Sequence, residues 1–127
     1  MRRFSRILGI CLVIGVVAVT IDYALVNSKN RRVAGVVNDC GGRMGSIPAW
    51  PIGTEYRISF PHPLSSAQLD RLKELNSLRG WVGVAFVECE LTEDQVREST
   101  SMLHNCHLFR VVDGEMAPLR VANTDAK

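Results

Sequence analysis

The feature that most constrains this chain is an almost uninterrupted apolar run of twenty residues, Ile7–Val26. As an α-helix the run is about 30 Å long, which matches the hydrocarbon thickness of a bilayer. The run is apolar on all sides, whereas a surface helix of a soluble protein carries a polar stripe. Its one charge, Asp22, lies about one turn from the end, beside the amphipathic ring of Tyr23. The sequence therefore predicts a transmembrane helix within an N-terminal segment, residues 1–28.

Two interpretations of this run stay open, a retained signal-anchor and a cleaved signal peptide. The basic start "MRRFSR" suits both. The best cleavage site is Ala18-Val19-Thr20, and its final Thr is a poor residue for cleavage, which favours retention. Three arginines precede the run, and Lys29, Arg31 and Arg32 follow it, so the positive-inside count is nearly tied. Because a short basic start is typical of a signal-anchor, we expect the C-terminal domain to be extracytoplasmic.

Formal charge divides the chain after Arg32. Residues 1–32 hold six basic residues against one acidic residue, a charge of +5, and residues 33–127 hold nine basic and twelve acidic residues, a charge of −3. A domain with a net negative charge lacks the basic surface on which nucleic-acid binding depends. We therefore expect the membrane, and no nucleic acid, as a partner.

The rest of the chain alternates between strand and helix patterns. We expect residues 29–55 to form a juxtamembrane helix that stops at Gly41-Gly42, then loops and a short strand about residues 43–47. Strands are predicted at residues 56–60, 81–89 and 108–112, with Trp81 to Phe86 largely buried. Ser65 and Thr92 are predicted helix caps, because each has a Gln three residues later, as in a capping box. Residues 114–127 are interpreted as a C-terminal tail.

Residues 56–113 contain two such units with an offset of 27 residues, a period typical of leucine-rich repeats. The first unit fits the consensus L-x-x-L-x-L-x-x-N/C-x-L only loosely. The second unit fills its five positions with Trp81, Val84, Phe86, Cys89 and Leu91. The chain thus resembles the longer, helix-containing leucine-rich repeats. It looks most like small bacterial membrane-anchored proteins that carry two or three degenerate repeats after an N-terminal span.

The resemblance implies an α/β domain of βα units with parallel strands, usually binding proteins on the strand face, and it implies no catalytic residue. Two repeats do not close a solenoid core alone, so residues 43–60 would have to act as a cap. The alternative is a small two-layer α/β sandwich that only looks like repeats. In the repeat arrangement the candidate interaction face carries Arg57, Ser59, Ala85 and Val87.

Chemically reactive side chains do not form a recognisable catalytic or metal motif. "HNCH" places His104, Cys106 and His107 together, but a metal site needs a further ligand with suitable spacing. Ser65 and Ser66 are explained by capping, and nothing resembles a nucleophile elbow or a phosphate-binding loop. We expect no enzyme activity and no cofactor, and the pairing of Cys40, Cys89 and Cys106 stays open.

Three functions are compatible with these features. The first, which the repeat and the predicted span favour, is a single-pass membrane protein that presents a small leucine-rich-repeat-like domain to a protein partner. The second is a structural subunit of a membrane complex that acts through its span. The third is a small exported metal- or redox-binding domain.

Overall fold

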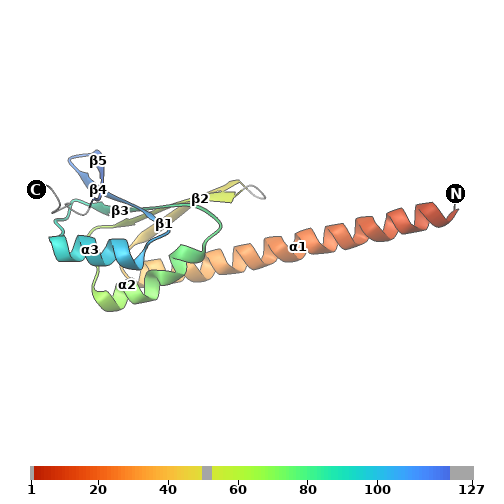
Figure 1. Cartoon of the computed structure of the whole chain (residues 1–127), viewed down its shortest axis with the longest axis horizontal. Coiled ribbons are helices and arrows are strands. Elements are labelled where there is room, and N and C mark those ends of the chain that lie inside the picture. Colours follow the sequence, from red (N-terminus) through yellow and green to blue (C-terminus); the bar gives the residue numbers. More distant parts are fainter. Residues whose placement is uncertain (1, 50–52, 121–127) are drawn as a thin grey trace, which may run out of the picture. The chain divides into compact units, whose positions relative to one another are not determined.

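The computed structural model describes residues 2–49 and 53–120 and divides into two compact units, Met1–Arg32 and Val33–Lys127 (Figure 1). The boundary after Arg32 is the position at which the formal charge changes sign.

The first unit is the greater part of helix α1, Arg2–Asp39. Its segment Arg6–Asp39 contains an apolar window of sufficient length to cross a membrane, and none of that window is buried. The side chains of Ile7, Leu12 and Leu25 are all more than half exposed. An exposed apolar helix near the N-terminus is consistent with a single membrane span or a signal sequence.

The second unit begins with the last turns of α1, which carry Val33 and Val37 into the core. The helix ends at Asp39, as the Gly41-Gly42 stop signal predicted. Gly42 N–H donates to the carbonyl of Val37, and Gly41 N–H donates to the carbonyl of Asn38, each at 2.9 Å. Gly41 has a φ of 78°, so these bonds form a Schellman motif that requires a left-handed residue.

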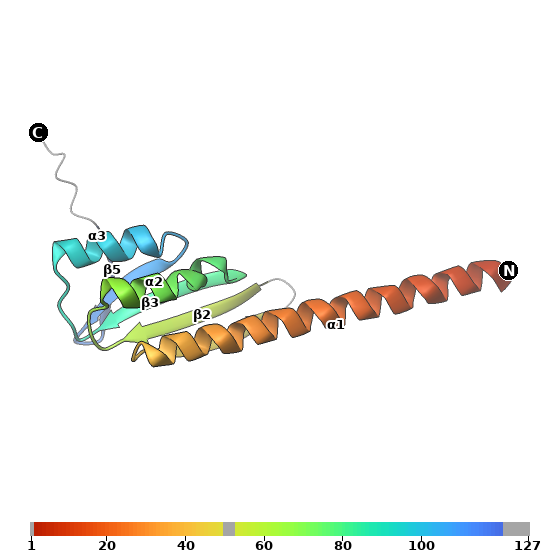
Figure 2. The same ribbon diagram turned by 90° about the horizontal axis from the view of Figure 1, so that it is seen from below.

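Five strands form one sheet in the order β1-β2-β3-β4-β5 (Figure 2). The strands are β1 Arg43–Ala49, β2 Gly53–Phe60, β3 Gly80–Val87, β4 His107–Val112 and β5 Glu115–Pro118. The central strands β2, β3 and β4 are parallel, whereas β1 and β5 are antiparallel to their neighbours. The sheet is thus mixed and is not a solenoid, and the expected parallel arrangement applies to β2–β4. Strand β5 lies in the segment interpreted as a tail, of which residues 121–127 lie outside the described residues.

Two helical crossovers connect the parallel strands. The first contains α2, Ser66–Leu72, followed by the 3₁₀ helix η1, Lys73–Ser77, and the second contains α3, Glu93–Met102. Ser65 caps α2 and Thr92 caps α3, each in a reciprocal capping box. The cap hydroxyl accepts a hydrogen bond from the backbone N–H of the Gln three residues later, Gln68 or Gln95. The side chain of that Gln in turn accepts a hydrogen bond from the backbone N–H of the cap residue. Each box satisfies two backbone donors that the helix leaves free.

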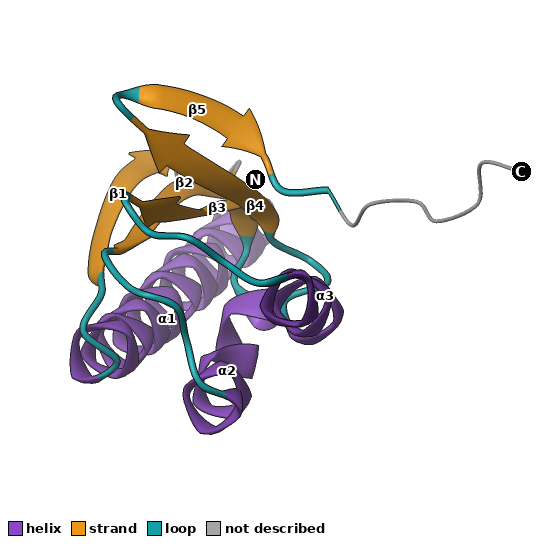
Figure 3. Ribbon diagram, turned by 90° about the vertical axis from the view of Figure 1, so that its left-hand side faces the viewer, coloured by secondary structure: helices purple, strands orange, loops and turns teal. Residues whose placement is uncertain are grey.

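These helices all cover the same face of the sheet, which makes the unit a two-layer α/β sandwich (Figure 3). The core between the layers consists of apolar side chains from the central strands, the helices and the end of α1. Its largest fully buried members are Tyr56, Phe60, Phe86, Ile58, Leu69, Leu72, Leu75 and Leu103.

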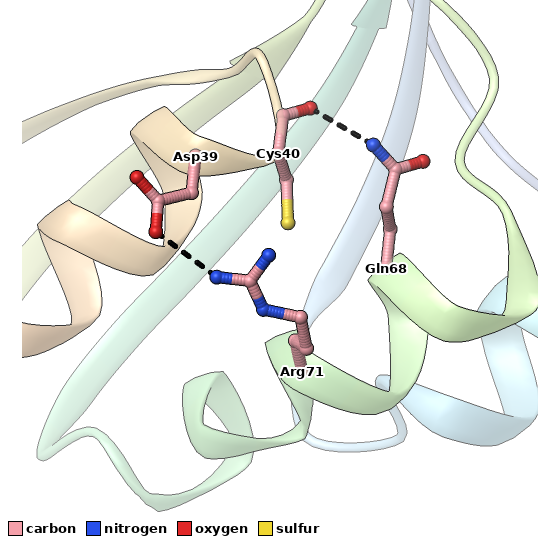
Figure 4. A network of polar contacts seen from close by, with 4 residues as sticks. All are labelled: Asp39, Cys40, Gln68 and Arg71. Atoms are coloured by element: carbon pink, nitrogen blue, oxygen red, sulfur yellow. Dashed lines mark hydrogen bonds and ion pairs between the residues drawn. The ribbon is translucent and has the colours of Figure 1, made fainter.

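Polar contacts join the C-terminal end of α1 to α2 at the rim of this core (Figure 4). Arg71 pairs with Asp39 at 3.0 Å, and Gln68 Nε2 donates to the carbonyl oxygen of Cys40 at 3.4 Å. Both charges are more than half exposed, so the ion pair contributes little stability. The amide contact instead satisfies a carbonyl that the helix terminus leaves without an intrahelical partner.

Candidate functional site

Among the described residues of the second unit, no helix covers the second face of the sheet (Figure 3). Because side chains alternate along a strand, the residues between the buried positions of β2 and β3 point to this side. The strand register then assigns the matching residues of the other strands. We call this surface the open face; its members include Gly45, Ile47, Glu55, Arg57, Ser59, Trp81, Gly83, Ala85, Val87, His107, Phe109 and Met116.

An aromatic cluster lies at the centre of the open face. The rings of Trp81 and His107 are stacked, with centroids 5.3 Å apart and planes 14° apart, and Phe109 lies 6.1 Å from Trp81. The indole lies directly over Gly83, since a Cβ built on that glycine would come within 2.4 Å of the ring. A glycine at this position therefore lets the large ring lie flat on the sheet.

A shallow groove of about 230 Å³ runs beside this ring. It is lined by Glu55, Arg57, Ile58, Trp81, Gly83, Ala85, Phe109 and Met116. Arg57 Nε donates to Glu55 Oε1 at 2.7 Å, so one edge of the groove carries a paired positive and negative charge. The lining is otherwise apolar and aromatic, a combination that suits recognition of a complementary surface more than chemical catalysis.

All four residues of the predicted interaction face belong to the open face. Arg57 is registered with Gly83, and Ser59 with Ala85, on adjacent parallel strands, and Val87 follows two positions beyond Ala85. Whether a partner binds there stays a prediction. Trp81 also lies here, with an exposed fraction of 40%, so the expected burial from Trp81 to Phe86 is wrong at its first residue.

The other residues at repeat positions have mixed environments. Val84 and Phe86 are fully buried, whereas Cys89 and Leu91 are partly buried and pack against the core from the loop after β3. Trp81 points away from Val84 and Phe86, because it lies three and five positions before them, odd offsets along the same strand. The five positions thus do not share one inward-facing layer, as a leucine-rich repeat would require.

The "HNCH" residues diverge in space. His107 stacks on Trp81 on the open face, whereas the Cys106 thiol contacts Asn76 Oδ1 at 3.8 Å on the helical side. Desolvation by burial raises the pKa of the Cys106 thiol to about 11, so at neutral pH it is protonated and a poor nucleophile. Among the described residues, no three His, Cys, Asp or Glu side chains are placed to hold a metal ion.

The cysteines, all four of which lie in the described residues, are free thiols. Cys11 is exposed on α1, Cys40 is buried, and Cys89 and Cys106 are partly buried. Burial also raises the pKa of Cys89. A thiol whose pKa is raised has less of the reactive thiolate, which disfavours a redox function for Cys89 and Cys106.

Sequence reasoning missed Gly83, Phe109 and Met116 as members of this site. Phe109 had a usable signal, because His107, Phe109 and Val111 alternate with the inward Leu108 in β4. Gly83 shared the alternation that identified Ala85 two positions later, but its role depends on the rotamer of Trp81. Met116 had no signal, since its position depends on strand β5. Comparison of the chain with protein-family models, curated proteins and solved structures finds no match.

Proposed function

We propose that this chain is a single-pass membrane protein whose second unit, residues 33–127, binds a protein partner through the open face. The observation that carries the proposal is the aromatic cluster of Trp81, His107 and Phe109 on a sheet face that no described helix covers. Exposed apolar surface beside polar groups is typical of interaction sites, and Trp is among the residues that most often anchor them.

The proposal places the second unit outside the cytoplasm, with α1 as an uncleaved signal-anchor. The exposed apolar helix supports the membrane part of this proposal, and the basic start supports the orientation. The leucine-rich-repeat-like character is proposed only for the two βα units of strands β2–β4, since the antiparallel edges depart from that pattern.

The anchor is tested by alkaline extraction of membranes that contain the full chain. We expect the chain to stay in the membrane pellet at its full mass, and Ile14→Arg to release a large fraction, because a charge at the centre of a span is costly. A shortened, extractable wild-type chain would instead establish a cleaved signal peptide. Accessibility of an introduced tag at the C-terminus then determines the side of the membrane.

The interaction face is tested by placing a photo-cross-linking amino acid at Ser59 in cells that express the full chain. The matched control is Lys73, which is exposed on η1 on the helical side. We expect protein adducts from position 59 and few from position 73. Equal adducts at both positions, or none at position 59, would contradict the proposal.

A second variant distinguishes this function from a structural role of the span. Residues 7–26 are replaced by an unrelated apolar sequence of the same length, which keeps the anchor but changes its surface. Adducts from position 59 that persist after the exchange support recognition by the domain. Adducts that disappear would favour a subunit that assembles through its transmembrane helix.

A further inference from the structure

Two neighbouring rows of residues cross the open face at right angles to the strands. The strand register places Ile47, Glu55 and Trp81 side by side on β1, β2 and β3. The next outward row, two residues away on each strand, holds Gly45, Arg57 and Gly83. One row therefore holds a large, an acidic and a large residue. The other holds a glycine, a basic residue and a second glycine, of which Gly83 is covered by the Trp81 ring of the same copy and only Gly45 leaves open space.

When the open faces of two copies pack against each other about a two-fold axis, the first row of each copy meets the second row of the other, and the two rows are complementary. A two-fold axis that runs across the strands between the rows places Ile47 of each copy over Gly45 of the other. Glu55 and Arg57 already pair within each copy at 2.7 Å. The same operation places Glu55 of each copy over Arg57 of the other, so the two ion pairs join into one network of four alternating charges. Each indole lies over its own Gly83, so the two Trp81 rings meet across the axis.

We propose that the partner of the open face is a second copy of this chain, packed sheet against sheet with Glu55 of each copy facing Arg57 of the other. The inference deepens the proposed function and rests on its membrane anchor. A symmetric pair requires a surface that is complementary to itself in charge and size, because every contact between the two copies occurs twice about the two-fold axis.

The expected contact area explains why the anchor matters. Three strands about 4.8 Å apart and roughly seven residues long at about 3.3 Å per residue cover on the order of 300 Å² per copy. Stable interfaces bury about 800 Å² per partner, so this pair is weak in solution. Two copies held in one membrane have a high effective concentration, which compensates for the small area.

The test uses full-length chains in phosphatidylcholine vesicles, with Cys11, Cys89 and Cys106 replaced by alanine to remove the exposed and partly exposed thiols. One tagged copy carries Gly45→Cys and a second, differently tagged copy carries Ile47→Cys. Mild oxidation is expected to give the mixed disulfide at least tenfold faster than it does when Gly45→Cys is combined with Ser66→Cys on the helical side. A rate equal to that control would overturn the proposal.

Charge exchange tests the same geometry without relying on a disulfide. Glu55→Arg alone and Arg57→Glu alone are each expected to slow the mixed cross-link about fivefold or more, because each creates like-charge contacts. A mixture of the Glu55→Arg copy with the Arg57→Glu copy is expected to restore it, which also shows that both variants fold. If the mixture of the two variants does not regain the wild-type rate of cross-linking, the proposed alignment of Glu55 with Arg57 between the copies is overturned.

The outcomes separate this inference from the proposed function. Adducts from position 59 to a different protein, without the mixed disulfide, would end the second-copy proposal and leave the interaction module standing. Release of the chain from membranes at alkaline pH would remove the anchor on which both depend. The mixed disulfide in detergent at the vesicle rate would show that the membrane is not required.

Discussion

The parallel centre of the sheet and its antiparallel edges differ in almost every physical property. Strands β2 and β3 bury one face along most of their length, β4 buries Leu108 on the same side, and capped helices connect the three strands. Strand β5 is exposed at all four residues, and β1 has no fully buried residue among those whose side chains are described. The difference indicates that the centre supplies stability, whereas the edges extend the surface available for recognition.

Two isoleucines on adjacent strands give the largest expected contrast between centre and edge. Ile58 on β2 is 2% exposed and faces the core, whereas Ile47 on β1 is 54% exposed on the open face. Ile58→Ala should lower the free energy of unfolding by about 2–5 kcal/mol, because it removes buried methyl groups and leaves a cavity. Ile47→Ala should lower it by less than about 1 kcal/mol.

Urea denaturation of the full chain in detergent micelles, followed by tryptophan fluorescence, measures both values. Since the substitution is the same, differences in side-chain transfer energy cancel and only the environment remains. Equal losses at the two positions would show that the edge is packed as tightly as the centre, and would remove the distinction.

The parallel centre could be predicted from the sequence better than the antiparallel edges could. The centre has local signals: alternating apolar residues in β2, and Gln68 and Gln95 placed three residues after Ser65 and Thr92. The end of α1 was also predictable, because the glycine pair is a chemical requirement of the Schellman motif. These features depend on residues close in sequence, which is why a pattern reveals them.

The edges carried no comparable signal. Strand β5 is four residues long and has no buried position, so neither burial nor alternation distinguishes it from a tail. The open face was predicted in part through Arg57 and Ala85, since strand alternation alone separates the two faces. The position of Trp81 was not predicted, because a tryptophan side chain is normally expected to face the core. Here Gly83 provides room for the ring on the open face.

Two glycines with left-handed or related backbone conformations give the second contrast. Gly80 begins the central strand β3 with a φ of 128°, and a Cβ there would lie 2.0 Å from the carbonyl oxygen of Thr54. Gly80→Ala should cost about 2–3 kcal/mol, because strain and a backbone clash combine. Gly114, in the turn between β4 and β5, has a φ of 78° but an open surrounding, so Gly114→Ala should cost only about 1 kcal/mol.

Thermal unfolding of both variants in the same micelles tests this prediction. A wild-type-like unfolding temperature for Gly80→Ala would mean that β2 and β3 can separate at this end without loss. A larger effect at Gly114 than at Gly80 would mean that the edge hairpin, and not the parallel centre, limits the stability of the unit.

The helix caps give the smallest effect, and they test whether the crossovers belong energetically to the centre. Thr92→Ala removes the hydroxyl that accepts from Gln95 N–H at 3.3 Å and should cost about 1 kcal/mol. Thr100→Ala is the matched control on the same helix. Its hydroxyl is exposed and donates only to the carbonyl of Val96, so its removal should change stability by less than about 0.5 kcal/mol.

Urea denaturation again provides the measurement, now with the slope as a second readout. If α3 unfolds together with the parallel strands, Thr92→Ala shifts the midpoint and leaves the slope unchanged, because the same surface is exposed in one step. A reduced slope with little change in midpoint would instead mean that α3 detaches separately. In that event the second crossover would behave like an edge of the sheet, and the boundary between centre and edge would lie at β3 and not at β4.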